Sequence, residues 1–231
     1  MDKVKKLVRR ELVENELLER AADLFAERGF NGTTLQDVAD TVGLTRAAFY
    51  HYFDSKEALL TTLVEGITAA RVADLKKICL DESLTANEKL ARLTRAMALN
   101  VATHAARFRL LLLSENELPG DLAAKHARGR REILKRLVEL FQAGCESGEF
   151  KAVDPHLGAF ALLGMCNWIA MWFKPDQKKS AEEVADEYVE IALTAFGCAR
   201  ADRKAAADEL PATIARMRED LSRLERLTHS T

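Results

Sequence analysis

The polar side chains whose spacing points most directly to a chemistry lie between positions 30 and 60. Each stands just before a short apolar run, where hydroxyl and carboxylate groups cap the first turn of a helix. The candidate caps are Thr33 or Thr34, then Thr45, then Asp54 or Ser55, with Gln36, Asp37 and Glu57 placed to complete capping boxes. Three closely spaced helix starts, with a turn at Gly43 between the first two, are the layout of a helix-turn-helix. Such a unit hydrogen-bonds to bases and phosphates of DNA through the major groove.

Residue patterns that support catalysis are missing from the sequence. The five histidines are isolated, and there is no H-E-x-x-H, no G-x-S-x-G and no glycine-rich phosphate loop. Acidic residues have basic neighbours three or four positions away, which is the usual pattern of a solvated helix face. We therefore expect no enzyme, no metal site and no cofactor. A helical adaptor that uses the unit only for protein contacts is the other alternative, which the completeness of the motif disfavours.

The same stretch resembles the N-terminal region of the TetR-type transcriptional regulators. The matching strings are G-F-x-x-T-T at 29–34, D-V-A at 37–39, G-L-T-R-A-A-F-Y-H-Y-F at 43–53 and S-K-E-A-L-L at 55–60. The resemblance implies an all-α protein with an N-terminal three-helix helix-turn-helix head and a helical ligand-binding and dimerisation body. It implies a head at 1–55, a body at 56–200 and an additional segment at 201–231.

The resemblance also implies which residues contact a double-stranded DNA operator. Arg46 is the candidate for a guanine contact, because its guanidinium can pair with both O6 and N7. Side chains at helix N-termini can hold phosphates together with backbone amides. Ala47 stands where many relatives carry glycine, but it is also small. The residues expected to contact DNA are Thr33, Thr34, Thr45, Arg46, Ala47, Tyr50, His51 and Lys56, whereas Phe49 and Phe53 are expected in the core.

Charge is nearly balanced along the 231 residues. The sequence has 34 Lys and Arg against 36 Asp and Glu, so the formal net charge is −2 and there is no overall basic field. Basic residues gather at the N-terminus, at Lys3, Lys5, Lys6, Arg9 and Arg10. This segment either follows a phosphate backbone or is a solvated terminus.

The N-terminus is charged and lacks the apolar stretch of a signal peptide, so a cytoplasmic location is expected. The four cysteines are far apart and form no C-x-x-C pair: Cys79, Cys145, Cys166 and Cys198. Free thiols in a reducing compartment are the expected state, and a redox switch is the alternative.

Beyond the motif, apolar residues recur at helical spacing. Helices are expected at about 55–79, 86–103, 108–113, 122–147, 155–173 and 181–196, with Asp154-Pro155 as a helix start. At 201–231, Leu210, Ile214, Met217, Leu221 and Leu224 indicate either an additional amphipathic helix or a mobile tail.

Every residue from 157 to 173 is apolar or glycine except Asn167. The length is marginal for a membrane span, and nothing else in the sequence favours a membrane. A helix in the core of a monomer normally has a polar face. We therefore favour a helix buried partly by its own subunit and partly by a second copy.

Relatives dimerise through their last two body helices, which implies a homodimer and a palindromic operator. The expected interface residues are Phe160, Leu163, Asn167, Trp168, Met171, Trp172, Tyr188 and Ile191.

The resemblance further implies a small-molecule effector in the body and, by family habit, repression. Pocket candidates are Met97, Phe108, Leu112, Phe141, Met165 and Trp168, although core packing explains each equally well. The string at 164–176 resembles the dimer helix of a subgroup that senses acyl-coenzyme A thioesters. Candidate partners for coenzyme A phosphates are Arg107, Arg109, Arg128 and Arg131, with surface solubility as the alternative. A drug-type or other hydrophobic inducer of an efflux regulator is the alternative ligand class.

Overall fold

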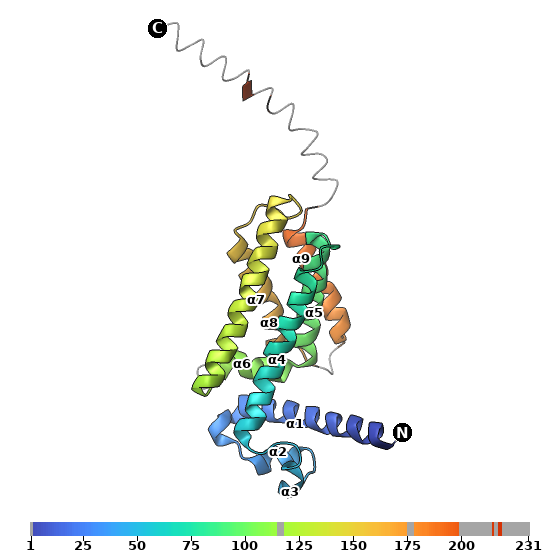
Figure 1. The fold of residues 1–231 in the computed structure, drawn as a ribbon, viewed down its shortest axis with the longest axis vertical. Helices are drawn as coiled ribbons and strands as arrows, with labels where there is room; N and C mark the ends of the chain where they lie inside the picture. The colour runs from blue at the N-terminus through green and yellow to red at the C-terminus, as the bar shows by residue number, and fades with distance from the viewer. Residues whose placement is uncertain (1, 115–117, 175–177, 199–213, 215–216, 219–231) are drawn as a thin grey trace.

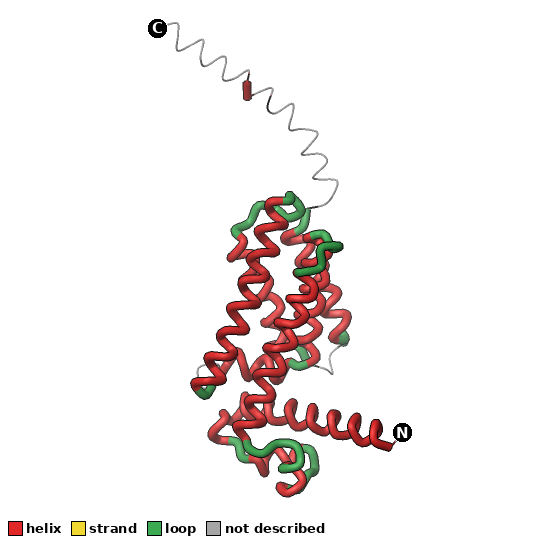
Figure 2. Tube along the Cα trace, viewed as in Figure 1, coloured by secondary structure: helices red, strands yellow, loops and turns green. Residues whose placement is uncertain are grey.

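The computed structural model describes residues 2–114, 118–174, 178–198, 214 and 217–218, and the regular structure in these residues is helical (Figure 2). The helices are α1 (Asp2–Gly32), α2 (Leu35–Thr41), α3 (Arg46–Phe49), α4 (Lys56–Cys79), α5 (Ala86–Thr103), α6 (Ala105–Ser114), α7 (Gly120–Glu146), α8 (Pro155–Trp172) and α9 (Ala181–Phe196). The all-α prediction is confirmed. The helix or tail expected at 201–231 lies outside the described residues, apart from positions 214, 217 and 218.

A small head of α1, α2 and α3 lies at one end of an elongated body, and α4 runs from the head into the body (Figure 1). The helical conformation of α1 is interrupted at Gly29, whose φ of 74° would be strained for a residue with a side chain. Phe30 then folds back, with its ring centroid 5.2 Å from that of Phe25. This break separates the long first helix from the short helices of the head.

Side-chain caps start the helices of the head. Thr34, and not Thr33, caps α2: its hydroxyl accepts from the Asp37 amide at 3.1 Å, and its own amide donates to the Asp37 carboxylate at 2.7 Å. Ser55 caps α4, so the alternative box from Asp54 to Glu57 is wrong. The capping predictions therefore located these starts to within one residue.

The helix after Gly43 is shorter than the expected run through Phe53. It ends at Phe49, after which the amides of His51 and Tyr52 bond three residues back, to Ala48 and Phe49. The tighter turn brings Phe49 and Phe53 into the core, as predicted, with ring centroids 5.9 Å apart. The last turn of the expected helix is therefore a tighter turn, which allows Phe49 and Phe53 to pack in the core.

The buried residues of the head and body form one continuous core. In the body, α5 packs along α9, α4 along α7, and α8 lies against α5, α6 and α7. Gly129 permits the close approach of α7 to α4, because a Cβ there would lie 2.2 Å from Thr68 Cγ2. No helix in the described ranges combines the length and apolarity that a membrane crossing needs.

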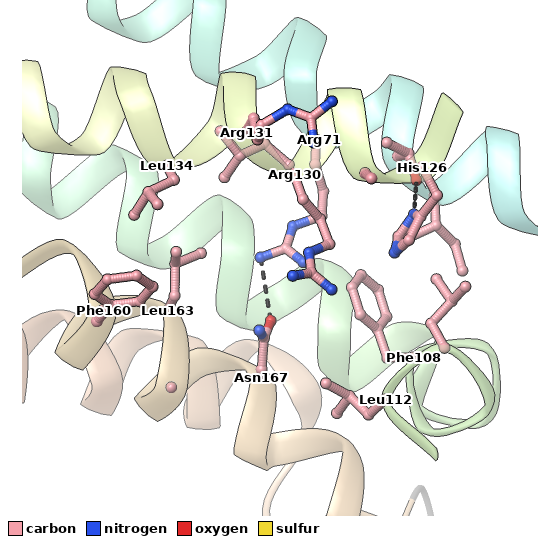
Figure 3. A pocket seen from close by; sticks show the side chains of 16 residues that line it. Arg71, Phe108, Leu112, His126, Arg130, Arg131, Leu134, Phe160, Leu163 and Asn167 are labelled. Atoms are coloured by element: carbon pink, nitrogen blue, oxygen red, sulfur yellow. Dashed lines mark hydrogen bonds between the residues drawn. The ribbon is translucent and has the colours of Figure 1, made fainter. Parts of the chain in front are cut away.

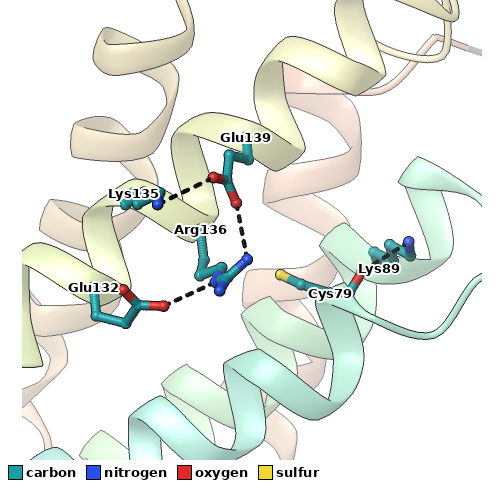
Figure 4. Close-up of polar contacts among 6 residues, drawn as sticks. All are labelled: Cys79, Lys89, Glu132, Lys135, Arg136 and Glu139. Atoms are coloured by element: carbon teal, nitrogen blue, oxygen red, sulfur yellow. Dashed lines mark hydrogen bonds and ion pairs between the residues drawn. The ribbon is translucent and has the colours of Figure 1, made fainter.

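One face of α7 carries alternating charges (Figure 4). Arg136 pairs with Glu132 at 2.9 Å and with Glu139 at 3.2 Å, while Lys135 lies 3.9 Å from Glu139. These pairs span three or four residues, as on an ordinary solvated helix surface. The solvated-face interpretation of the charge pattern is confirmed here.

Candidate DNA-binding face and ligand cavity

The start of α3 presents polar groups to solvent. Thr45 caps the helix by accepting from the Ala48 amide at 3.2 Å, and Arg46 and Ala47 follow it on the exposed surface. A guanidinium nitrogen of Arg46 lies 3.5 Å from the Tyr50 hydroxyl, one turn further on. The short α3 lies at the end of the head away from the body (Figure 1).

The N-terminal helix passes close to the same edge. A guanidinium nitrogen of Arg10 lies 3.4 Å from the backbone carbonyl oxygen of His51, whose side chain is exposed. Arg10 is the last of the N-terminal basic residues, and its own charge lies beside the end of α3. The side chains of Lys3, Lys5, Lys6 and Arg9 are outside the described part of the structure.

Two residues expected to contact DNA instead hold the head together. Thr33 is fully buried, and its hydroxyl is bonded to the carbonyl oxygens of Leu24 at 3.3 Å and Gly29 at 3.0 Å. The DNA contact expected of its side chain is therefore wrong. The Lys56 ammonium donates to the carbonyls of Phe30 at 2.7 Å and Thr33 at 2.9 Å and lies over the Phe30 ring. The Lys56 contacts join residues more than twenty positions apart, so sequence spacing could not reveal them. Those of Thr33 reach back only four and nine residues.

A cavity of about 420 Å³ lies between four body helices (Figure 3). Its size is within the range of small-molecule sites, about 300–1,000 Å³. The lining comes from α4 (Ile67, Thr68, Arg71), α6 (Phe108, Leu111, Leu112), α7 (His126, Ala127, Arg130, Arg131, Ile133, Leu134) and α8 (Phe160, Leu163, Gly164, Asn167).

The polar groups of this cavity are few. Arg71 donates to Asn167 Oδ1 at 3.2 Å, and its guanidinium carbon lies 5.1 Å from the Phe108 ring centroid (Figure 3). His126 Nδ1 is 2.9 Å from the Thr68 hydroxyl, which also bonds to a backbone carbonyl of α4. Burial lowers the pKa of the Arg71 guanidinium to about 10. The cavity is therefore apolar in bulk, with cationic groups in its wall.

The expected pocket residues are only partly in this wall. Phe108 and Leu112 line the cavity, whereas Met97, Phe141, Met165 and Trp168 do not. Phe141 packs instead against Phe150 and Phe196, and Trp168 is exposed. Core side chains and pocket side chains have the same apolar spacing, so the sequence alone could not separate them.

Of the four arginines considered for phosphate binding, only Arg131 lines the cavity. Arg71 and Arg130 were missed. A signal for Arg71 was present, because it follows Ile67 by four residues and so continues the buried stripe of α4. Asn167, the lone polar residue of its helix, carried the second signal.

Arg107 and Arg109 of α6 join the body to α1. Arg107 is nearly buried; its Nε lies 2.8 Å from Glu19 Oε1, and a terminal nitrogen donates to the Asn15 carbonyl at 3.2 Å. His104 Nδ1 lies 2.7 Å from the same Glu19 oxygen. Burial lowers the pKa of Arg107, and the Glu19 carboxylate opposes this shift. Arg109 reaches Asp23 only at 3.9 Å.

The outer side of α8 and α9 is apolar and open in the single chain. Trp168 is 64% exposed and Phe160 55%, and the buried side of α8 is formed by Leu162, Cys166 and Ile169. Met171, Trp172 and Ile191 are also exposed, whereas Tyr188 is partly buried. Leu163 and Asn167, expected at an interface, line the cavity, and the exposed Phe160 lines it as well.

The four cysteines are free thiols. Burial raises the pKa of Cys79 and raises that of Cys166 to about 12. Both groups are neutral at pH 7, and neutral thiols react slowly with oxidants. These two positions thus favour the expected unreactive thiols over a redox switch.

Comparison with known proteins identifies the class. Residues 17–63 match the family model described as bacterial regulatory proteins of the tetR family, and residues 83–196 match the tetracyclin repressor-like C-terminal domain. The chain belongs to the TetR family of transcriptional regulators. It is a DNA-binding helix-turn-helix regulator rather than an enzyme.

Particular relatives cover most of the chain. The HTH-type transcriptional repressor KstR2 of Rhodococcus jostii is 30% identical over 187 residues, which are 77% of this chain and 88% of that protein. The structure of the ketosteroid transcriptional regulator KstR2 of Mycobacterium tuberculosis is 26% identical with a TM-score of 0.71, covering 80% of this chain and 95% of that one. AibR, in a crystal structure with isovaleryl coenzyme A and operator DNA, is 29% identical with a TM-score of 0.59, covering 77% and 96%.

Proposed function

We propose that this protein is a ligand-responsive repressor that binds a palindromic operator as a homodimer and is released by an acyl-coenzyme A-type ligand. The observation that carries the proposal is the position of the cavity between α4 and α6. Both helices reach the head: α4 continues into it, and α6 holds α1 through Arg107 and Glu19. A ligand that favours one spacing of these helices must change DNA affinity by its differential binding to the two states.

The proposed DNA contacts are made by Thr34, Thr45, Arg46, Ala47, Tyr50 and His51, all exposed at the tip of the head. Arg46 supplies a bidentate donor, for which a single base contact contributes about 1–3 kcal/mol of discrimination. Lys56 acts indirectly in this proposal, by fixing the junction of α1 and α2.

The DNA test uses a palindromic duplex selected from a randomised pool by the wild-type protein. Arg46→Ala combined with Tyr50→Ala is expected to weaken binding by at least about ten-fold. Lys76→Ala, an exposed charge change in the body, is the matched control and should leave affinity unchanged. Circular dichroism checks that the double variant is folded. Unchanged affinity in a folded double variant would contradict the proposed recognition edge.

The proposed dimer buries the open apolar side of α8 and α9. Trp168, Phe160 and Ile191 are each more than half exposed, and large exposed apolar patches mark interaction sites. A two-fold dimer requires the same patch on both copies, and aromatic residues are the usual anchors of such interfaces. Two heads on one dimer would read two half-sites about one helical turn apart.

Sedimentation velocity tests the dimer. Wild type is expected to sediment as a dimer, and Trp168→Glu as a monomer, because a carboxylate would be buried in an apolar interface. Leu80→Glu changes an exposed leucine at the far end of α4 and should remain dimeric. A wild-type monomer would also remove the reason to expect a palindrome.

The ligand class is supported by the AibR relative, whose structure holds isovaleryl coenzyme A. Titration of the protein–DNA complex with isovaleryl coenzyme A and decanoyl coenzyme A, followed by fluorescence anisotropy, tests it. Release of DNA by a thioester, but not by free coenzyme A, is the expected result. Release only by uncharged hydrophobic compounds would support the drug-type inducer instead.

A further inference from the structure

The Arg71 side chain is partly buried, and its guanidinium is a cation with no counter-charge among the described residues. It has two polar or aromatic neighbours, the Asn167 amide oxygen and the Phe108 ring, and its Nε is buried with no hydrogen-bond partner. Its titratable neighbour is Cys166, whose thiol is neutral because burial raises its pKa to about 12. Within the described residues, Arg71 therefore lacks the carboxylate that normally accompanies a buried guanidinium.

Two further arginines stand in the described part of the wall. The described residues that line the cavity include Arg130 and Arg131 as well, and neither aspartate nor glutamate. Elsewhere in the body, nearly buried Arg107 has its own carboxylate in Glu19. Arg71 thus differs from Arg107 in having no carboxylate partner among the described residues.

The surroundings of Arg71 are otherwise apolar. Ile67, Phe108, Leu111 and Leu163 contribute hydrocarbon surface to the same wall. In such surroundings a charge-assisted bond to a carboxylate or phosphate is stronger than on the open surface, because the effective dielectric constant is lower. A planar guanidinium also offers two parallel N–H donors to such a group.

We propose that Arg71 is the specificity-determining residue of the cavity and selects an amphipathic organic anion. The acidic group binds Arg71 beside Asn167, and the hydrocarbon part fills the space between α6 and α8. This inference deepens the ligand-responsive function proposed above and rests on it for its biological meaning. The acidic group is either the carboxylate of a free acid or a phosphate of an acyl-coenzyme A, and the test separates these sources.

The experiment measures displacement of the neutral fluorescent probe N-phenyl-1-naphthylamine from the full-length protein. Decanoate and 1-decanol share a hydrocarbon chain and differ in the charged group. Wild type is expected to bind decanoate at least about ten-fold more tightly than 1-decanol, since one charge-assisted pair suffices for this ratio. Equal affinities for decanoate and 1-decanol, or no displacement of the dye by decanoate, would overturn the proposal.

Two variants locate the effect. Arg71→Met should abolish the preference for decanoate, whereas Arg128→Met, an exposed arginine of α7 outside the lining, should retain it. Asn167→Asp places a carboxylate beside the guanidinium and should weaken decanoate binding by at least about ten-fold, because the cation is then already paired. Unchanged preference in folded Arg71→Met or Asn167→Asp would contradict the assignment.

Thermal unfolding of the ligand-free variants separates selection from structural support. Replacing an unpaired buried charge by methionine is expected to leave Tm unchanged or raise it, and Asn167→Asp should raise it. A marked fall in Tm for both variants would make Arg71 a structural link between α4 and α8, against the proposal.

The last measurements distinguish a free acid from a thioester as the ligand, and they separate this inference from the proposed ligand-responsive function. Decanoyl coenzyme A that binds with the same dependence on Arg71 identifies a thioester as the source, and binding of decanoate alone identifies a free acid. If decanoate binds through Arg71 but neither decanoate nor decanoyl coenzyme A changes DNA affinity, the inference stands and the ligand-responsive function fails. If a thioester releases DNA equally from wild type and Arg71→Met, the function stands and the inference fails.

Discussion

Replacing Glu19 by glutamine removes the carboxylate that holds the first helix to the body. Glu19 Oε1 lies 2.8 Å from Arg107 Nε and 2.7 Å from His104 Nδ1, and both partners come from the segment around the start of α6. The Arg107 side chain is 9% exposed and that of Glu19 29%. The substitution therefore leaves a nearly buried guanidinium without its counter-charge while keeping the shape of the side chain.

The expected cost follows from burial. Removing one partner of a fully buried pair costs about 3–5 kcal/mol, and the desolvated remaining charge accounts for most of it. Here the glutamine amide can still accept a bond, and Arg107 keeps its bonds to the Asn15 carbonyl at 3.2 Å and to its side-chain oxygen at 3.3 Å. Glu19 is also partly screened by solvent. We therefore expect Glu19→Gln to lower the free energy of unfolding by about 2 kcal/mol.

A double-mutant cycle in urea measures this term. Arg107→Met removes the charge that needs a partner, so adding Glu19→Gln to that background should cost less than about 0.5 kcal/mol. The same variants also test the coupling between the ligand cavity and the DNA-binding head. The factor by which ligand lowers DNA affinity should be smaller in Glu19→Gln than in wild type. Strict additivity of the two substitutions, or a cost below about 0.5 kcal/mol for Glu19→Gln alone, would refute the assigned role.

Three further outcomes are expected. Gly129→Ala gains about 1 kcal/mol of helix propensity but places a Cβ 2.2 Å from Thr68 Cγ2. We therefore expect the free energy of unfolding in urea to fall by about 1 kcal/mol. An increase would show that α4 and α7 separate easily. The Thr34 hydroxyl and amide lower the pKa of Asp37, so the stability that these hydrogen bonds contribute is present above the unfolded pKa and is lost as pH falls through the lower folded pKa. In acid titrations of the free energy of unfolding, Thr34→Ala should therefore lose less stability than wild type. Parallel curves for the two proteins would contradict this. Because the pKa of Cys166 is raised to about 12, alkylation at pH 8 followed by peptide mass spectrometry should leave Cys166 unmodified until urea unfolds the chain.

The helix starts could be predicted from sequence because caps are local. Thr45 and Ser55 bond to amides three residues away, and such contacts depend little on the rest of the fold. The same locality explains the predicted helix bounds at 86–103 and 181–196, which the structure reproduces. In the head, the string of motif residues fixed the order of the elements.

The roles of single side chains were less accessible. Thr33 and Lys56 look like solvent-facing polar residues at helix starts, yet their partners lie across the junction of α1 and α2. Arg71 continues the buried stripe of α4 in the sequence, but only the packing of α6 and α8 shows that it lines a cavity. These assignments depend on tertiary contacts, for which spacing along one segment carries little information.

The continuity of α4 has a mechanical consequence. Fifteen residues separate Lys56, at the head, from Arg71, at the cavity, so the helix between them is a lever arm about 22 Å long. A tilt of about 5° about the cavity end displaces the head end by about 2 Å. In the proposed dimer the opposite head moves equally, and the total of about 4 Å is comparable with the 3.4 Å rise of one base pair. In the proposed dimer, a change of about 5° in the direction of α4 at the cavity would therefore be enough to shift the half-site register by about one base pair.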